Sequence, residues 1–132
     1  MKKLFKTVLY LSAIGVSLFL LIFVISCTWI GFDVKNQCQT ATHVYGGDCV
    51  TALSSLVSDE HRGFRERNSA IWALGQLGDS RAYPLLKGMY TGNIPDREPL
   101  DAMISQYELK KAVALTNGGY NMTAVFWRYG IQ

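Results

Sequence analysis

The sequence predicts an all-α protein in which one transmembrane helix precedes a small helical domain. The first observation is an apolar run at residues 8–32, which contains no Asp, Glu, Lys, Arg or His. The second is the spacing of apolar residues in the second half of the chain, where they recur every three or four positions. The third is a set of glycines and prolines that divides this half into separate helices. At 132 residues, the chain has room for one membrane segment and one domain of roughly a hundred residues.

The apolar run is long enough to cross a membrane. A helix rises about 1.5 Å per residue, so about twenty residues cross a hydrocarbon core of about 30 Å, and residues 8–32 exceed that length by a few positions. The run is also longer than the apolar stretch of about 7 to 15 residues in a cleavable signal peptide. We therefore predict a basic N-terminus at residues 1–7 and a transmembrane helix at residues 8–32, with Trp29 and Phe32 near the membrane interface.

Charge predicts the orientation of this helix. Lys2, Lys3 and Lys6 precede the run, whereas Asp33 and Lys35 nearly cancel just after it. The positive-inside rule places the N-terminus in the cytoplasm and the domain outside it, with a bacterial inner membrane and periplasm as the expected location. The three lysines also equal the whole net charge of +3, so the domain is close to neutral and gives no indication of nucleic-acid binding.

An alternative interpretation of the same region is a lipoprotein. Residues 24–27, Val-Ile-Ser-Cys, loosely resemble a bacterial lipobox, in which Cys27 would be lipidated after cleavage. Ile25 fits poorly, because a small residue is expected before Ser26, and the sequence stays apolar beyond the expected cut. In either case the domain remains attached to a membrane.

The segment after the apolar run carries two cysteines. Residues 33–47 show no helical periodicity, so we expect a linker or loop there. Cys38 lies within it and Cys49 just after it, on the side where oxidising conditions favour disulfides. We expect a Cys38–Cys49 bridge; the alternative is a buried Cys49 and a free thiol at Cys38. A metal site is less favoured, because the two cysteines and His43 lack the paired spacing of zinc ligands.

The first two helices of the domain, residues 48–132, follow from caps and apolar spacing. Asp48 can cap a helix at residues 49–57, whose apolar residues share one face. Residues 65–77 carry the most regular apolar face, and Gly78 supplies the stop. These two helices are expected to form an amphipathic pair.

The remaining elements are less regular. Asp79 or Ser80 can cap a third helix that ends near residues 90–92, and residues 93–99, with two prolines, indicate an insertion loop. A fourth helix is expected at residues 100–115, in one piece or broken around Ser105. The tail at residues 120–129 is rich in aromatic and β-branched residues and forms either a short strand or, as we favour, a final helix.

An internal repeat relates these helices. A shift of 31 positions superposes Gly47-Asp48 on Gly78-Asp79, each directly before a helix. Residues 67–82, Arg-Asn-Ser-Ala-Ile-Trp-Ala-Leu-Gly-Gln-Leu-Gly-Asp-Ser-Arg-Ala, resemble the HEAT-repeat family in the short form found in phycobilin lyases. The resemblance implies a short α-solenoid of about two helix pairs with a protein-binding surface.

Several residues are candidates for partner binding or for a structural role. The resemblance implies that Asp79 and Arg81 belong to a polar network that ties adjacent helices. Trp72 flanks the main apolar face and could line a groove, where Trp often dominates binding energy. Arg62 and Arg65 lie in a basic group that could receive an acidic partner or lipid headgroups. We expect Trp72, Arg62 and Arg65 to contact the partner, with ordinary packing or a solvated surface as the alternative for each.

No catalytic residue, cofactor or metal site is expected. Asp59, Glu60 and His61 form the only cluster of acids with an imidazole, and a solvated turn is its simplest explanation. Deoxyhypusine hydroxylase, an enzyme of the wider family, holds iron with His-Glu pairs, whereas this chain has only His43 and His61. We therefore expect a non-enzymatic adaptor or assembly factor that binds an unidentified protein and the lipid bilayer. The alternatives are an accessory subunit docked through its transmembrane helix and a ligand-binding or enzymatic domain.

Overall fold

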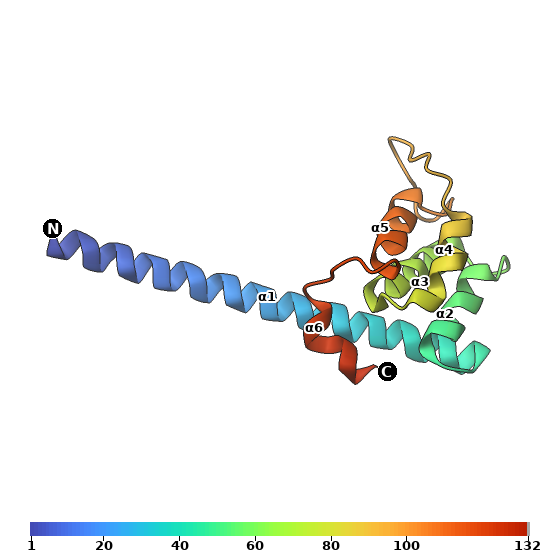
Figure 1. The fold of residues 1–132 in the computed structure, drawn as a ribbon, viewed down its shortest axis with the longest axis horizontal. Helices are drawn as coiled ribbons and strands as arrows, with labels where there is room; N and C mark the ends of the chain where they lie inside the picture. Colours follow the sequence, from blue (N-terminus) through green and yellow to red (C-terminus); the bar gives the residue numbers. More distant parts are fainter. Residues whose placement is uncertain (132) are drawn as a thin grey trace.

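The computed structural model describes residues 1–131, which form six α-helices and two short 3₁₀ helices without any strand. The all-α prediction is therefore confirmed for this range. Figure 1 shows helix α1 (Lys2–Tyr45) as a long rod, with the remaining helices gathered around its C-terminal part.

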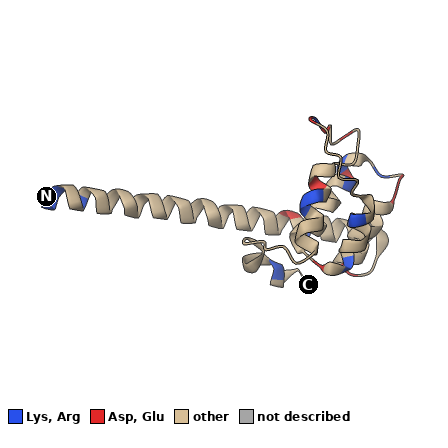
Figure 2. Cartoon of the chain, turned by 45° about the horizontal axis from the view of Figure 1, so that its top comes forward, with Lys and Arg blue, Asp and Glu red and all other residues tan. Residues whose placement is uncertain are grey.

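The first part of α1 projects away from the domain. Every residue from Met1 to Ile22 is exposed, and an 18-residue window of the helix has a mean hydropathy of 2.7 with none of its residues buried. Figure 2 shows basic residues at the N-terminal end of α1 and then a long uncharged stretch up to the domain. The helix is long and apolar enough to span a membrane.

The second part of α1 corrects the expectation of a linker or loop at residues 33–47. The helix continues without a break to Tyr45, and Gly46 ends it with a φ of 71°. Its buried positions in this part recur every three or four residues and are Gly31, Val34, Cys38 and Ala41. Because most of these residues are small, they carry little hydrophobic signal in the sequence, although they let other helices approach α1 closely. The domain is therefore built directly on α1.

Helices α2 (Cys49–Ser58) and α3 (Phe64–Leu77) confirm the first predicted pair. The Asp48 carboxylate caps α2 by accepting a hydrogen bond from the backbone N–H of Thr51 at 3.1 Å. Gly78 ends α3 in the left-handed conformation, with a φ of 63°. The largest fully buried apolar side chains of the shared core are Leu53, Ile71, Leu74, Leu86, Leu109, Val34 and Val57.

The disulfide between Cys38 and Cys49 is present and joins α1 to the first residue of α2, with the two Cα atoms 4.9 Å apart. The predicted pairing is therefore confirmed. Cys27 is a free, buried thiol on α1.

The second pair consists of α4 (Tyr83–Met89), preceded by the 3₁₀ helix η1 (Ser80–Ala82), and α5 (Gln106–Thr116). Asp79 caps η1 through the backbone N–H of Arg81, as one of the two capping alternatives predicted. Helices α3 and α5 pack very closely: a Cβ atom added to Gly75 would lie 2.9 Å from the Cα atom of Ala112.

The expected helix at residues 100–115 is too long by its first six residues, and the break lies at Ser105, where the second alternative placed it. Residues 100–105 form turns and extended chain, and α5 begins only after Ser105, whose hydroxyl caps it. The reason is the buried amide of Asn68 on α3. Its Nδ2 donates to the carbonyl oxygens of Leu100 and Met103, at 2.9 and 2.8 Å, and its Oδ1 accepts from the N–H of Ser105 at 2.9 Å. These backbone groups are satisfied by a side chain rather than by a helix.

The tail folds back onto α1 as α6 (Ala124–Trp127) and the 3₁₀ helix η2 (Arg128–Gly130), so the favoured helical alternative is confirmed. Figure 1 shows α6 lying beside α1 near the base of the domain. The rings of Phe126 and Phe23 meet edge to face, with centroids 5.5 Å apart. A Cβ atom added to Gly31 would lie 2.7 Å from the Cβ atom of Trp127, so the glycine permits the close approach of α6.

Candidate partner-binding site

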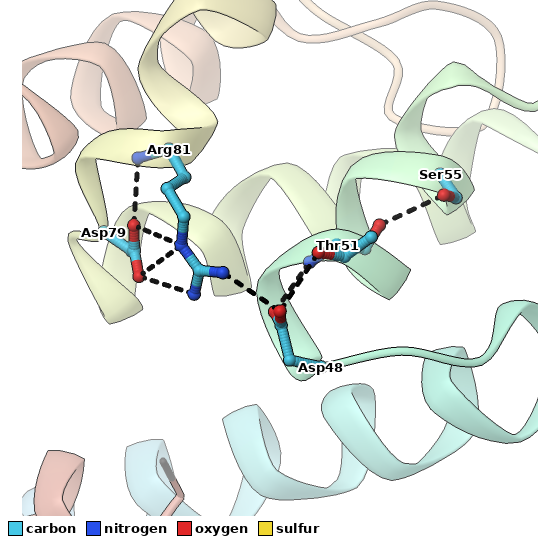
Figure 3. A network of polar contacts seen from close by, with 5 residues as sticks. All are labelled: Asp48, Thr51, Ser55, Asp79 and Arg81. Carbon is cyan, nitrogen blue, oxygen red and sulfur yellow. Dashed lines mark hydrogen bonds and ion pairs between the residues drawn. The ribbon is translucent and has the colours of Figure 1, made fainter.

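A polar network joins the starts of the two helix pairs (Figure 3). The Nη1 atom of Arg81 donates to Asp48 Oδ2 at 2.9 Å, and its Nη2 donates to Asp79 Oδ2 at 2.9 Å. Asp48 is also the cap of α2, and Asp79 is the cap of η1. One guanidinium therefore holds two capping carboxylates that the internal repeat places at equivalent positions.

The network lowers the pKa of both carboxyl groups. For Asp48 the main cause is the hydrogen bond from the N–H of Thr51, followed by the hydrogen bond from Arg81. For Asp79 the main cause is the hydrogen bond from Arg81, and this contact also raises the pKa of Arg81 itself. The side chains of Arg81 and Asp48 are more than half exposed, so the network is open to solvent. These are the contacts that a structural role requires, and the role itself stays a prediction.

A groove between α1 and α3 is the main candidate for partner binding, and we call it the Trp72 groove. It is lined by Trp29, Ile30, Phe32, Asp33 and Trp72. The side chains of Trp29 and Phe32 are 78% and 73% exposed, whereas Trp72 is half-buried and packs against the core. The groove thus combines two free aromatic side chains of α1 with a fixed indole of α3.

Arg65 lies on the same face of α3 as Trp72. The two residues are seven positions apart, which is about two helical turns, so their side chains point in nearly the same direction. Arg65 is exposed and forms no ion pair with any residue from 1 to 131. The structure therefore places Arg65 and Trp72 on one surface.

Arg62 does not join this surface but belongs to the turn between α2 and α3. Its guanidinium lies 3.7 Å from the Glu66 carboxylate and 3.9 Å from that of Asp59, and 6.0 Å from the centre of the Tyr45 ring. Arg62 is thus engaged by its own neighbours. These contacts do not test whether Arg62 binds a partner, so that role stays a prediction.

The cluster of Asp59, Glu60 and His61 forms part of the same turn. Asp59 accepts hydrogen bonds from the Tyr45 hydroxyl at 2.6 Å and from the backbone N–H of His61 at 3.0 Å. The Tyr45 hydrogen bond is the main cause of the lowered pKa of Asp59, and it raises the pKa of Tyr45. The His61 side chain is almost fully exposed. The cluster ties the end of α1 to the α2–α3 turn.

The comparison with known families concerns α3 and α4. Residues 66–89 match the PBS lyase HEAT-like repeat. The match begins in the first turn of α3 and ends at the last residue of α4, with the Asp79–Arg81 contact between them. No curated protein and no solved structure matches the chain.

The HEAT-like repeat supports the predicted family resemblance and indicates a helical protein-interaction domain. Repeats of this type are usually non-catalytic scaffolds, and the lyase in the name of the family leaves an enzymatic activity open. The contribution of α1 to the Trp72 groove was missed at the level of sequence. The available signal was the aromatic pair Trp29 and Phe32 directly before Asp33, which sequence reasoning assigned to the membrane interface alone.

Proposed function

We propose that this protein is a membrane-anchored adaptor or assembly factor whose HEAT-like domain binds a protein partner at the extracytoplasmic membrane surface. The observation that carries the proposal is the Trp72 groove, which α1 and α3 build together. Exposed aromatic clusters of this kind mark protein or membrane contact sites. No catalytic step forms part of the proposal.

The groove has the chemistry of a protein-binding site. Buried Trp and other aromatic side chains supply most of the binding energy at interfaces, and polar residues surround them. Here Trp29, Phe32 and Trp72 form the apolar part and Asp33 of α1 adds a charge. Arg65 lies two turns before Trp72 on the same face of α3 and adds a charge of opposite sign to that face. Such a surface suits a partner that inserts an apolar side chain into the groove and places charged residues around it.

The position of the groove restricts the partner. Trp29 and Phe32 lie at the end of the uncharged stretch of α1, where a spanning helix leaves the hydrocarbon core. A partner in the groove would therefore touch the membrane surface. We expect it to be a membrane protein or a protein held at the same surface.

Site-specific crosslinking in native membranes tests the proposal. A photoreactive phenylalanine derivative is placed at Trp72 or at Trp29, with Lys87 on the exposed side of α4 as the matched control. We expect the same protein to be captured from both groove positions and not from Lys87. Arg65→Glu should reduce the capture from Trp72, since it reverses the charge on the face of α3 that carries Trp72.

An accessory subunit that docks through its transmembrane helix is the second candidate. It is favoured by the apolar surface of α1, which is exposed up to Ile22, and by Gly15, where an added Cβ atom would meet no atom within 4 Å. Replacing residues 11–24 with an unrelated apolar helix separates the two candidates. After this replacement an adaptor keeps the partner captured from Trp72, whereas a helix-docked subunit loses its partner. In the chain without the replacement, the partner of a helix-docked subunit is captured from positions such as Phe19 and not from Trp72.

The lipoprotein alternative makes a different prediction about the mature chain. Cleavage before Cys27 would remove Phe23, the residue against which Phe126 packs. An intact mass that includes residues 1–26 would support the spanning helix, and a mass of the shorter, lipidated chain would support the lipoprotein.

A further inference from the structure

The tail beyond α5 leaves an unusual amount of apolar surface uncovered. Its exposed large apolar residues are Tyr120, Met122, Val125, Phe126 and Tyr129, and the last two are 68% and 85% exposed. A concentration of exposed apolar residues in one short segment is typical of a contact with a protein or a membrane. Its position on α1 decides between these two.

Helix α6 lies beside the outer end of the uncharged stretch of α1. Phe126 contacts Phe23, and Trp127 contacts Gly31. The stretch is limited by Lys6 on one side and by Asp33 on the other. About twenty helical residues cross a hydrocarbon core, so the core can take two limiting positions along this stretch. If it begins just after Lys6, it ends near residue 27. If it ends just before Asp33, its last residue is 32. Phe23 therefore lies roughly 6 to 13 Å inside the core in either case.

We infer that the C-terminal segment, residues 120–131, is a second membrane contact that lies in the outer leaflet beside α1, with Phe126 at the depth of the acyl chains. The inference rests on the proposed spanning of the membrane by α1. It adds a membrane-facing element that no apolar run in the sequence indicates, since residues 120–131 include the polar residues Asn121 and Arg128.

Polar contacts fix the tail to the domain. Asn121 Nδ2 donates to Gln76 Oε1 at 2.8 Å, and Arg128 Nη2 donates to the carbonyl oxygen of Gln76 at 2.8 Å. The end of α3 therefore holds the tail in place. The large apolar side chains of the tail stay exposed, and transferring them to a non-aqueous surface is favourable.

The groove between α1 and the tail is apolar at one end and carries a basic residue at the other, which matches the two parts of an anionic membrane lipid. Its apolar end contains Phe23, Val24 and Phe126, and its other end contains Lys35. Lys35 follows Phe23 by twelve positions on one helix, which is about 18 Å along the axis. An acyl chain fits the first end, and a lipid phosphate fits the ammonium group at the second. Tyr129 and Trp127 belong to the aromatic types that prefer this interfacial region.

Depth measurement by fluorescence tests the inference on the full chain. The chain is reconstituted in vesicles of equal parts phosphatidylcholine and phosphatidylglycerol, with an environment-sensitive label on a cysteine introduced at Val125. Leu18→Cys on α1 is the membrane control and Lys87→Cys on α4 is the aqueous control. The unsubstituted chain measures any labelling of Cys27, which is buried.

We expect the label at position 125 to emit at shorter wavelength than the label at 87 and to be quenched several-fold more by lipids spin-labelled close to the headgroup. A label at 125 that behaves like the one at 87, while the label at 18 is quenched, overturns the inference and leaves the spanning helix intact. Absence of quenching at 18 by lipids spin-labelled deep in their acyl chains overturns the spanning helix itself.

A second pair of variants tests whether α1 positions the tail. Gly31→Leu forces a side chain into Trp127, whereas Gly15→Leu adds the same side chain where no atom lies within 4 Å. We expect Gly31→Leu to reduce the quenching at position 125 towards the value at 87, and Gly15→Leu to leave it unchanged. Equal quenching in both variants would overturn the positioning of the tail by α1.

Discussion

The disulfide between Cys38 and Cys49 gives a stability prediction that can be calculated from the chain. The two residues are 11 positions apart. In the chain-entropy treatment, a link across a loop of this length lowers the entropy of the unfolded chain by about 9 cal/mol/K, which stabilises the folded state by about 2.8 kcal/mol at 25 °C. Reduction of the bond should therefore lower the free energy of unfolding by about that amount. For a small domain this is a large fraction of the total stability.

Urea unfolding in detergent micelles, followed by near-ultraviolet circular dichroism, measures the effect with and without a reductant. Reduction leaves both side chains in place, so the comparison contains no cavity term. The matched control replaces both cysteines with alanine, and its stability should not respond to the reductant, because Cys27 is already a free thiol.

A loss below about 1 kcal/mol in the reduced chain would contradict the reasoning. It would mean that residues 38–45 remain helical on the micelle-bound α1 after the domain unfolds, so that the loop has little entropy to lose. The same bond also reports on orientation. If alkylating reagents modify Cys38 and Cys49 in intact cells without a reductant, the domain lies on the reducing side, and the proposed topology is wrong.

Three further predictions concern the packing and the charges of the domain. Gly75→Ala should lower the free energy of unfolding by about 1 to 3 kcal/mol, because the added methyl group meets α5, whereas Gly88→Ala, with no neighbour within 4 Å, should not destabilise; chemical unfolding of both variants checks this. Asn68→Leu should leave three backbone groups of the α4–α5 connection unsatisfied and cost about 2 to 3 kcal/mol, with faster proteolysis of that connection than of the tail as the specific readout. Because the pKa values of Asp48 and Asp79 are lowered from 3.8, their ionised forms contribute stability above that pH and lose it as the pH falls through the lowered values. The variant Asp48→Asn/Asp79→Asn should have a free energy of unfolding lower than that of the natural chain by less than about 1 kcal/mol at neutral pH, and this difference should disappear below pH 4. A difference that does not depend on pH would contradict the role of these charges.

The elements that were predicted well are those whose signals are local. Asp48 caps α2 and Gly78 stops α3, because each of these events depends on one side chain or one backbone conformation. The apolar run of α1 and the pairing of Cys38 with Cys49 likewise follow from residues close together in the chain.

The elements that were predicted poorly depend on distant residues. The second part of α1 lacks an apolar stripe because small residues meet the domain there, and α5 begins late because Asn68 holds the preceding backbone. The surfaces at Trp72 and Phe126 could not be predicted for the same reason, since each combines α1 with a segment that is distant in the sequence.

The sequence by itself determined that one long apolar helix leads into a helical domain with a HEAT-like repeat, because helix periods, caps and hydropathy act over a few residues. Only the tertiary structure decided which side chains share a surface. It placed Trp29 and Phe32 beside Trp72, and the tail beside Phe23, because these contacts depend on close approaches at small residues such as Gly31 and on polar contacts made by Gln76. Such approaches depend on the shapes of two elements at once, which no local pattern contains.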